Sequence, residues 1–473
     1  MLFNSYAFLV FFPIVAILYF VIPNNKWRNY FLLAASYYFY MGWKAEYALL
    51  LLSSTLITYL SALAIQHFSY KKIALLLCIL LNLSILFFFK YYQFAAENIA
   101  VILDWLHLSI RFPKLDILLP VGISFYIFQA LGYSIDVYRG DIKAERNFFK
   151  YALFVSFFPQ LVAGPIERSK NLLRQFEKKH TFNGDLAVVG ITMMLWGYFL
   201  KLVIADNIAE YVDLIYNHGI ATETGTSMLL ASILFCFQLY GDFAGYSYIA
   251  IGCSKVMGFH LMDNFRRPYF MSTSIQDYWK RNHISLTSWF MDYVYYPLVG
   301  NSIRLSWWCF SIFITFVISG FWHGAAWTYV VCFAIFGIYL VVCSLKEKAQ
   351  SRFEKQHQLK KKEWWKWLNR FITFLLVAFA LIFFRANSLA DAITVIEKIF
   401  TNITIQWTHP NGFRNILFCL LVLFITESLI EYKKISVTAK NFPYIYTSCS
   451  IVLLFFILWF GKYNGGQFIY FQF

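Results

Sequence analysis

Two histidines in apolar surroundings are the residues of this chain best suited to chemistry. His323 lies in the stretch Ser-Gly-Phe-Trp-His-Gly over 319–324, and His283 precedes it in the segment 276–293. A neutral imidazole can take a proton near pH 7, so it can activate a hydroxyl for attack on an activated acyl group. An ionisable residue within a membrane segment is a candidate for a functional site. The competing interpretation is a histidine that only hydrogen-bonds a neighbouring helix.

The surroundings of His323 indicate that another chain segment or a substrate comes close to it. The apolar run that contains it extends over about residues 305 to 345, so we expect this histidine at about mid-depth in a bilayer. Gly320 and Gly324 lie on either side of it. Because glycine has no Cβ, each of these positions allows a close approach of backbone or ligand.

The segment that contains His283 has the pattern of an amphipathic helix. Its apolar side chains fall on one helical stripe and its polar side chains fall on another. The apolar stripe holds Trp279, His283, Leu286, Phe290 and Tyr293, and the polar stripe holds Arg281, Ser285, Ser288 and Asp292. The pattern predicts a helix over 276–293 at or within the membrane interface, with His283 on its apolar side. There His283 either takes part in chemistry or satisfies a polar neighbour.

Composition indicates an integral membrane protein. Of the 473 residues, 60% are hydrophobic and 14% are charged, whereas soluble domains carry about 25% charged residues. Apolar stretches near the about 20 residues that span a bilayer recur along the chain. They cover about 6–23, 30–41, 46–66, 72–89, 119–138, 148–165, 186–205, 227–252, 305–345, 368–384, 413–430 and 443–461. We therefore expect one all-α membrane domain over 1–473 with about ten to twelve membrane segments. Several are too short to cross alone, so we expect them to be tilted or re-entrant.

The basic residues follow the pattern of cytoplasmic loops. The net charge is +15, and lysine and arginine gather in short loops at 24–29, 167–180 and 346–366. A further group comprises Arg266, Arg267, Lys280 and Arg281. The positive-inside rule predicts that the three loops face the cytoplasm, where they also attract anionic lipid headgroups. Because no nucleic-acid reader motif accompanies this charge, we expect membrane lipid and not nucleic acid as a partner.

Absent motifs restrict the chemistry further. The eight cysteines lie in apolar segments without a Cys-x-x-Cys pair, so we expect buried hydrophobic residues rather than disulfides or metal ligands. The chain lacks Gly-x-Ser-x-Gly, His-Glu-x-x-His, a phosphate-binding Gly-x-x-x-x-Gly-Lys loop and Gly-x-Gly-x-x-Gly. We therefore predict no metal site and no tightly bound cofactor. A histidine-dependent transferase and a small-molecule transporter both stay open, because transporters also place ionisable residues at mid-depth.

Several blocks of residues, none very specific alone, become specific through their shared order and spacing. They are Met1-Leu2-Phe3-Asn4-Ser5 with Pro13, Ser36–Tyr40 (SYYFY), Leu119–Gln129 (LPVGISFYIFQ), Phe158–Ile166 (FPQLVAGPI), Asp242–Ser247 (DFAGYS), Arg281–Leu286 (RNHISL), Phe321–Gly324 (FWHG), Phe383–Ala386 (FFRA) and Phe468–Phe473 (FIYFQF). Together they resemble the membrane-bound O-acyltransferase family, and in particular its bacterial alginate O-acetylation type.

This resemblance implies a fold, a reaction and partners. The fold is a ring of tilted and re-entrant helices around a central tunnel, with His323 as the catalytic histidine and His283 as the second histidine of the family. Asn282 stands where many relatives have a tryptophan directly before that second histidine. The implied reaction uses a cytoplasmic acyl thioester, which we expect to be acetyl-CoA, to O-acetylate a cell-surface polysaccharide. The implied setting is the bacterial cytoplasmic membrane, with an extracytoplasmic acetyltransferase as partner protein.

Two alternatives accompany the resemblance. A related branch transfers D-alanine from an acyl carrier protein to teichoic acids, and it shares the two histidines and the tunnel. The opening and closing blocks of this chain are more similar to the polysaccharide acetylation branch. The alternative of another class is the transporter, for which we find no internal repeat in the chain.

Overall fold

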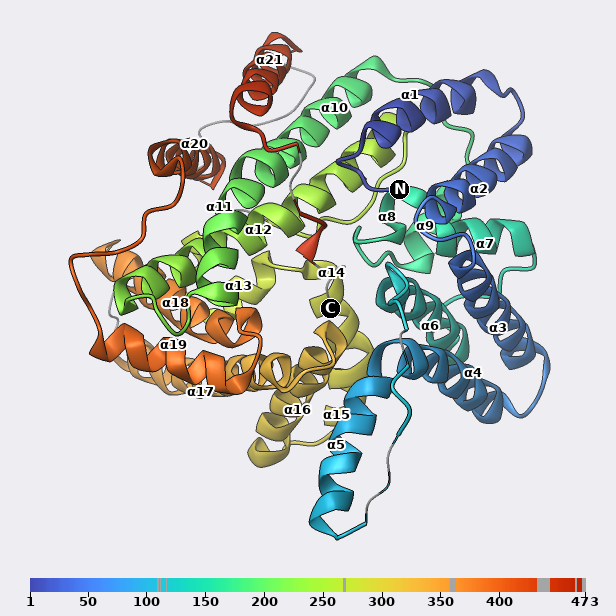
Figure 1. Ribbon diagram of the computed structural model, residues 1–473. Coiled ribbons are helices and arrows are strands. Elements are labelled where there is room, and N and C mark those ends of the chain that lie inside the picture. Colours follow the sequence, from blue (N-terminus) through green and yellow to red (C-terminus); the bar gives the residue numbers. More distant parts are fainter. Residues whose placement is uncertain are drawn as a thin grey trace. The chain divides into compact units, whose positions relative to one another are not determined.

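A computed structural model describes residues 1–108, 110, 112–115, 117–266, 269–357, 363–431, 443–463 and 466–469, and every regular element within these ranges is helical (Figure 1). Arg267, Lys360–Lys362 and the closing residues 470–473, which the sequence analysis used, lie outside these ranges. The all-α class expected from composition is therefore confirmed for the described part of the chain.

The helices group into two compact units along the chain. Unit 1 comprises Met1–Met194 and Ile249–Met262, and unit 2 comprises Leu195–Tyr248 and Asp263–Phe473. Two long helices, α10 (Gly184–Tyr198) and α12 (Gly225–Val256), contribute residues to both units. The interpretation of 1–473 as a single domain stays a prediction.

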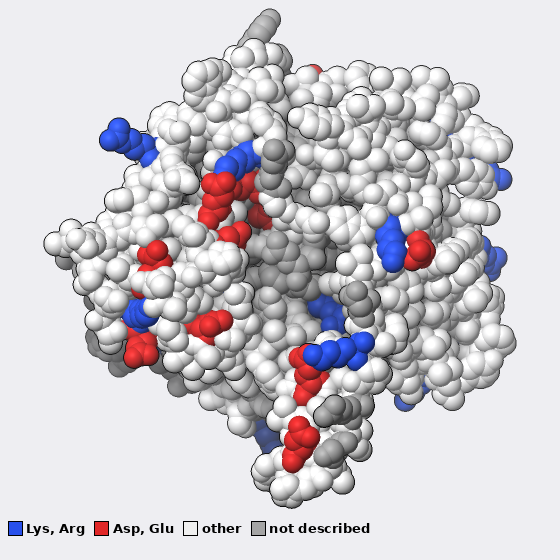
Figure 2. Space-filling model, viewed as in Figure 1, with Lys and Arg blue, Asp and Glu red and all other residues white. Residues whose placement is uncertain are grey.

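Eight helical stretches of the described chain are long and apolar enough to cross a membrane. They are Tyr47–His67, Lys71–Trp105, Gly184–His218, Gly225–Val256, Leu305–His323, Trp327–Lys346, Trp364–Arg385 and Phe413–Glu431. Two shorter apolar helices are Tyr6–Val21 and Tyr446–Phe460. In the view of Figure 2 most surface atoms belong to uncharged residues, and the charged side chains gather in a few clusters. The chain is therefore a multi-pass membrane protein.

Unit 1 consists of packed helices around an almost completely buried central helix. Its helices are α1 (Tyr6–Val21), α2 (Asn25–Met41), α3 (Tyr47–His67), α4 (Lys71–Leu86), the π-helical η1 (Phe87–Tyr91), α5 (Tyr92–Trp105), α6 (Ile123–Arg139), α7 (Phe148–Ser156), α8 (Phe158–Leu161) and α9 (Ser169–Gln175). The buried helix is α6, which begins after Gly122 at φ +74°. A Cβ at Gly122 would lie 2.7 Å from the carbonyl oxygen of Leu161, so the start of α6 packs directly on the backbone that follows α8.

Two expected membrane segments of unit 1 are short in the structure. The apolar stretch 119–138 forms α6, which has 17 residues, and the stretch 148–165 forms α7 and the four-residue α8. Almost all side chains of α6 are buried. A helix of 17 residues is about 26 Å long, and burial removes it from lipid contact. Its apolar composition therefore reflects packing inside the protein.

Unit 2 contains both candidate histidines and a further set of helical elements. They are η2 (Phe199–Ala205), α11 (Asp206–Asp213), η3 (Leu214–His218), η4 (Tyr269–Met271), α13 (Ile275–Arg281), α14 (Ile284–Phe290), η5 (Met291–Tyr295), α15 (Tyr296–Val299), α16 (Leu305–His323), α17 (Trp327–His357), α18 (Glu363–Arg385), α19 (Leu389–Thr401), α20 (Phe413–Glu431) and α21 (Pro443–Phe460). Of these, η2, η3 and η5 are π-helical and η4 is a 3₁₀ turn. η2, α11 and η3 continue α10, so that Gly184–His218 forms one long apolar helical stretch.

The eight cysteines all lie in the described part of the chain, and none is disulfide-bonded. Five are buried, namely Cys78, Cys236, Cys253, Cys332 and Cys419. Cys309 and Cys343 are half-buried, and Cys449 is exposed. The expectation of buried hydrophobic cysteines therefore holds for most of them and is wrong for Cys449.

Candidate active site

His323 is the last residue of α16 and not the centre of an unbroken helix. The apolar run over 305 to 345 divides into α16 and α17, with a short turn at Gly324–Ala326 between them. The 19 residues of α16 extend about 28 Å, which is close to the about 30 Å thickness of the hydrocarbon core. Because α16 ends at His323, this residue does not lie in the middle of a continuous helix. Its position at about mid-depth in the bilayer stays a prediction.

The two glycines beside His323 allow α16 and α17 to meet closely, as predicted. A Cβ at Gly320 would lie 2.8 Å from the carbonyl oxygen of Tyr329 and 2.9 Å from Cβ of Phe333. A Cβ at Gly324 would overlap the ring of Tyr329. In both places the partner is α17, so the close approach is an intramolecular helix contact. The glycines thereby allow α17 to pack directly against the end of α16, beside His323.

Aromatic rings surround the imidazole of His323. Its side chain is buried, and its ring stacks on Phe333 with ring centroids 4.5 Å apart at an interplanar angle of 26°. Trp322 and Phe384 contact it edge-on at 4.9 and 5.9 Å. This apolar enclosure excludes water, which strengthens electrostatic interactions at the ring and suppresses hydrolysis of a reactive acyl group.

His283 lies at a break in the helix that the sequence pattern predicts over 276–293. α13 ends at Arg281 and α14 begins at Ile284, so the prediction of one continuous helix is wrong. His283 occupies the junction in the left-handed conformation, with φ 47° and ψ 49°. Residues with a Cβ rarely adopt this conformation, because it costs free energy. Such conformations are found mainly at functional sites, where the surrounding structure enforces them. The apolar stripe itself is confirmed in part, since Trp279, Leu286 and Phe290 are buried.

Asn264 holds His283 in this unusual conformation. Its side-chain oxygen Oδ1 lies 3.2 Å from Nδ1 of His283 and accepts hydrogen bonds from the backbone N–H and hydroxyl of Ser285, at 3.2 and 2.8 Å. Its carbonyl oxygen accepts from the N–H of Ile284 at 2.9 Å, and its Nδ2 donates to Ser247 Oγ at 3.1 Å. Because an amide oxygen only accepts, the proton of a neutral His283 lies on Nδ1, and Nε2 carries the lone pair.

Burial also determines the charge of His283. The side chain is 2% exposed, and desolvation lowers the pKa of this imidazole well below its usual value. His283 lies outside the helices that are long enough to span a membrane. Since a lowered pKa means that the ring loses its proton at lower pH, His283 is neutral throughout the physiological range.

The structure brings the two predicted site residues together. The ring centroids of His283 and His323 are 6.1 Å apart, with an interplanar angle of 74°. Trp322 contacts both rings, and Phe243 contacts His283 at 4.4 Å. The histidine at the end of α16 and the histidine at the α13–α14 junction thus share one buried aromatic enclosure. The pair can activate a hydroxyl and position a reacting group beside it.

Arg281 connects the His283 junction to α20. Its guanidinium donates to Asp277 Oδ1 at 2.8 Å and to Glu431 Oε2 at 3.1 Å, and the arginine side chain is 13% exposed. Asn264 and Glu431 are supporting residues that the sequence analysis missed, and Ser247 belongs to the block Asp242–Ser247 without a role assigned to it there. The sequence contains no spacing pattern that would relate these three residues to His283.

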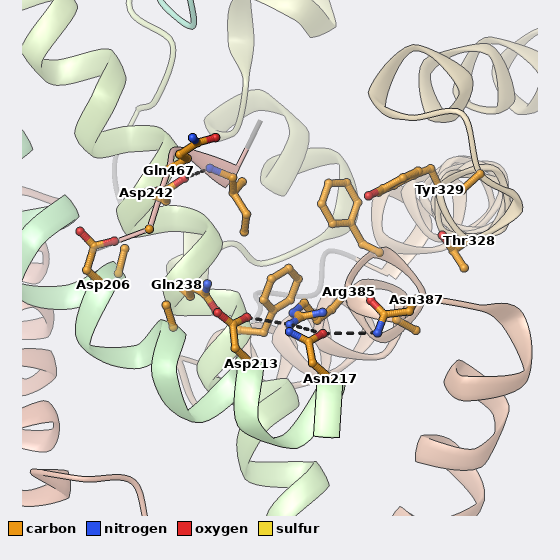
Figure 3. Close-up of a pocket in the computed structure, with 18 of the residues that line it drawn as sticks. Asp206, Asp213, Asn217, Gln238, Asp242, Thr328, Tyr329, Arg385, Asn387 and Gln467 are labelled. Atoms are coloured by element: carbon orange, nitrogen blue, oxygen red, sulfur yellow. Dashed lines mark hydrogen bonds and ion pairs between the residues drawn. The ribbon is translucent and has the colours of Figure 1, made fainter. Parts of the chain in front are cut away.

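A polar cavity of about 440 Å³ adjoins this enclosure within unit 2 (Figure 3). It is lined by η2, α11, η3, α12, the start of α17, the end of α18 and residues 466–469. Phe384 and Tyr329 form part of its wall, and Phe384 also contacts the His323 ring. One aromatic ring therefore lies between the cavity and the imidazole of His323.

Two ion clusters line the cavity. Nζ of Lys201 donates to Oδ1 of Asp206 at 2.7 Å and to Oδ1 of Asp242 at 2.6 Å. Nη2 of Arg385 donates to Oδ1 of Asp213 at 2.7 Å and to Oδ1 of Asn217 at 3.2 Å (Figure 3). Asp242 and Arg385 belong to two of the blocks on which the resemblance rests, although no role follows for them from the sequence.

An all-helical membrane protein with two buried histidines beside a polar cavity has the features of a histidine-dependent membrane transferase. The model of the membrane-bound O-acyltransferase family matches residues 141–386, which include both histidines. The protein named "probable alginate O-acetylase AlgI" of Pseudomonas aeruginosa is 36% identical over 418 residues, which cover 87% of this chain and 77% of that protein. This chain belongs to the membrane-bound O-acyltransferase family and is a membrane-bound O-acyltransferase.

Relatives with other substrates are also similar to the chain. The peptidoglycan O-acetyltransferase of Helicobacter pylori is 34% identical over 434 residues, which cover 84% of this chain and 79% of that protein. The teichoic acid D-alanyltransferase of Bacillus subtilis is 29% identical over 289 residues, which cover 58% of this chain and 71% of that protein. Family membership sets aside the transporter alternative.

Proposed function

We propose that this protein transfers an acetyl group from a cytoplasmic thioester donor, acetyl-CoA, for the O-acetylation of an extracytoplasmic polysaccharide in a bacterial inner membrane. The observation that carries the proposal is the pair of buried histidines, with ring centroids 6.1 Å apart. The relatives named above with the longest coverage are O-acetylating proteins of alginate and peptidoglycan, which supports an envelope polymer as the final target.

In the proposed reaction His323 is the catalytic base. It takes the proton of an acceptor hydroxyl while the hydroxyl oxygen attacks the thioester carbonyl carbon. The carbon–sulfur bond then breaks, a carbon–oxygen ester bond forms, and the proton passes from the imidazole to the leaving thiolate. The products are the O-acyl ester and the free thiol, so the step needs no further reactant. The enclosing rings of Phe333, Trp322 and Phe384 keep water from the thioester.

His283 serves in this proposal as the second histidine of the same step. With its proton on Nδ1 toward Asn264, its Nε2 accepts a hydrogen bond from the acceptor hydroxyl or from a neighbouring N–H group. Its neutral state follows from burial, which lowers its pKa. The contacts of Asn264 stabilise the left-handed backbone at His283. They thereby hold the ring beside His323, as expected of a positioned group.

The proposed partners follow from the two sides of the membrane. The basic loops predicted to face the cytoplasm attract the phosphates of a nucleotide-containing thioester as well as anionic lipid headgroups. On the other side, we propose that the acyl group is handed to an extracytoplasmic acetyltransferase or directly to the polysaccharide. A central tunnel, implied by the resemblance, would connect the two.

D-alanyl transfer to teichoic acids from an acyl carrier protein is the second candidate function. The Bacillus subtilis relative favours it, although its match covers less of this chain than those of the O-acetylating proteins. The test is deletion of the gene, followed by measurement of ester-linked acetate and ester-linked D-alanine on each surface polymer. Loss of acetate from a polysaccharide is the expected result. Loss of D-alanine with unchanged acetate would replace the proposal by the second candidate.

A further inference from the structure

The segment 466–469, which we call the C-terminal segment, is bound inside unit 2 by two charged side chains. Nζ of Lys201 donates a hydrogen bond to the carbonyl oxygen of Gly466 at 3.3 Å. Oδ2 of Asp242 accepts one from the backbone N–H of Ile469 at 2.7 Å (Figure 3). Lys201 also donates to Oδ1 of Asp242, so the lysine, the aspartate and the C-terminal segment form one hydrogen-bonded cluster.

The cluster is buried in a place where charged groups are costly. Lys201 and Asp242 are 6% and 3% exposed, and both lie in helical stretches that are long and apolar enough to span a membrane. Asp206 accepts a further hydrogen bond from Lys201 at 2.7 Å and lies near the charge of Lys462. Charged residues in such helices are functional candidates, and buried ion pairs stabilise a fold little relative to apolar residues of similar size. What the cluster holds in place explains it better than stability does.

The C-terminal segment packs an aromatic ring against α12. Phe468 is 3% exposed, and its ring centroid lies 4.7 Å from that of Tyr246 and 5.9 Å from that of Phe243. Phe243 in turn contacts the ring of His283 with centroids 4.4 Å apart. One phenylalanine ring therefore lies between the C-terminal segment and this histidine.

The contacts of His283 with α12 all come from the short stretch Asp242–Ser247. Phe243 contacts the imidazole ring, and Ser247 accepts a hydrogen bond from the asparagine that lies beside its Nδ1. Asp242, in the same stretch, binds the backbone of the C-terminal segment. A displacement of this stretch would therefore act on the ring of His283 and on its hydrogen-bond partner together.

We propose that the ion pair of Lys201 and Asp242 positions His283 for acyl transfer through the C-terminal segment. The pair holds the segment against α12, so that Phe468 packs on Phe243 and limits the rotation of the imidazole ring. Both charged residues are positioning residues, because they act through the segment and not on a reacting group. The role in acyl transfer rests on the function proposed above, whereas the support of the ring does not.

The kinetic test is a double-mutant cycle on the full-length protein in lipid nanodiscs. Free CoA released from acetyl-CoA is measured, with the surface polymer that loses acetate in the gene deletion as acceptor. Phe468→Ala should lower kcat roughly 10- to 100-fold, as for a reacting group displaced by about 1 Å. KM for acetyl-CoA should change by less than about 3-fold, because ring placement acts on the chemical step. In the His283→Ala background, Phe468→Ala should have less than about a 2-fold effect, since it acts through that ring.

Further variants connect the ion pair to the same effect. Asp242→Asn keeps one accepting oxygen and loses the charge, so kcat should fall roughly 3- to 10-fold, with no further fall when it is combined with Phe468→Ala. Phe468→Leu keeps an apolar contact with Phe243 and should bring kcat to within about 3-fold of the wild type. Melting temperatures are measured for every variant, and kcat refers to the folded protein.

Phe456→Ala is the matched control. The ring of Phe456 in α21 packs on Phe199 and Phe418 with centroids 5.8 and 5.9 Å apart, so it stabilises the preceding helix rather than the C-terminal segment. This variant should leave kcat of the folded protein unchanged in the wild-type background and in the His283→Ala background.

The ¹⁵N NMR spectrum of the His283 ring is a readout that does not depend on acyl transfer. Its signals are assigned by their loss in His283→Ala. The wild type should show one neutral tautomer with the proton on Nδ1, because Asn264 accepts there. In Phe468→Ala the signals should broaden or show both tautomers, and Phe468→Leu should restore the single tautomer.

The contrary outcomes are distinct. Wild-type ring signals in Phe468→Ala would overturn the proposal, whatever the change in kcat. An equal loss of kcat from Phe468→Ala with and without His283 would overturn it as well, because the effect would not pass through this ring. A loss of the single tautomer in Phe468→Ala, in a protein whose wild type transfers no acetyl group, would contradict the proposed function and leave the support of His283 by the C-terminal segment standing.

Discussion

The two histidines of the site are held by different kinds of interaction. His323 ends a regular helix and is enclosed by aromatic rings, with Gly320 fixing the contact of α16 with α17. His283 lies at a helix break in a left-handed conformation and is held by hydrogen bonds that His283 and the start of α14 donate to one asparagine. Ring packing excludes water but determines orientation loosely, whereas hydrogen bonds determine both the orientation and the tautomer. The difference favours chemistry at His323 and positioning at His283.

Substitution of His323 should produce the largest effect on activity. His323→Ala removes the proposed base, and loss of a positioned base costs about 10²- to 10⁴-fold in rate. Acyl transfer is measured as ester-linked acetate on the surface polymer and as turnover by the purified protein. Comparable amounts of variant and wild-type protein in the membrane, with similar melting temperatures, serve as the control. Near-normal acetylation in a well-expressed variant would remove His323 from the chemistry.

Substitution of Asn264 should alter the pH dependence through His283. Asn264→Asp keeps the accepting oxygen and adds a negative charge beside Nδ1, which stabilises the protonated imidazole and raises its pKa. In the wild type, burial lowers this pKa, so activity should fall only when the pH drops below that lowered value. In the variant the acidic fall in kcat/KM should move to higher pH by about 1 to 3 units.

The control for this shift is Asn98→Asp, the same substitution in α5, where Asn98 Nδ2 donates to a backbone carbonyl. It should leave the pH profile unchanged. An unshifted profile in Asn264→Asp, with activity retained, would show that His283 does not titrate in the rate-determining step. That result would narrow the role of Asn264 to holding the backbone of α14.

A substitution at Gly320 tests how α16 presents His323. In Gly320→Ala the new methyl group would lie 2.8 Å from a backbone oxygen of α17, so the two helices must separate. Overpacking of this kind typically costs about 1–3 kcal/mol, and the melting temperature should fall. Gly184→Ala is the control, since a Cβ there meets no atom within 4 Å. Equal melting temperatures for both variants would mean that the α16–α17 contact adjusts freely.

The membrane orientation of the His323 hairpin should follow from the basic segment 346–366, which comprises the end of α17, the start of α18 and the residues between them. Its basic charge predicts a cytoplasmic position, which places the α16–α17 turn toward the other face because Trp327–Lys346 is long enough to span. Position 360 lies outside the described residues, yet an engineered cysteine there should not react with an impermeant reagent in intact cells. A cysteine introduced in the turn at Ala325 serves as the comparison. Labelling at position 360 would invert the predicted topology.

The sequence predicts some features of this protein well and others not at all. Composition and hydropathy indicate the membrane class, because lipid imposes one simple rule on every spanning helix. The apolar stripe with Trp279, Leu286 and Phe290 is buried as predicted, since periodicity reports burial directly. The break at His283 escapes periodicity, because it depends on hydrogen bonds to Asn264 that form only in the folded chain.

The two histidines can be predicted as one site from the sequence, whereas the polar cavity cannot. The resemblance to a known family names both histidines, and the distance between them then agrees with a shared site. The cavity is built from η2, α11, η3, α12, α17, α18 and the C-terminal segment. Lysine and aspartate in an apolar helix indicate a polar site, but their grouping with Arg385 and Gln238 is a property of tertiary packing. A single sequence contains no period that relates them.

A double-mutant cycle tests the central claim most directly, namely that His323 and His283 act as one unit in acyl transfer. His283→Ala should reduce kcat/KM by less than His323→Ala does, at the lower end of the range for a positioned group. Because residues that act as a unit show non-additive losses, the double variant His283→Ala/His323→Ala should be about as active as His323→Ala alone. Losses that simply add in free energy would separate His283 from the chemistry of His323, and a fully active His283→Ala protein would reduce it to a structural residue.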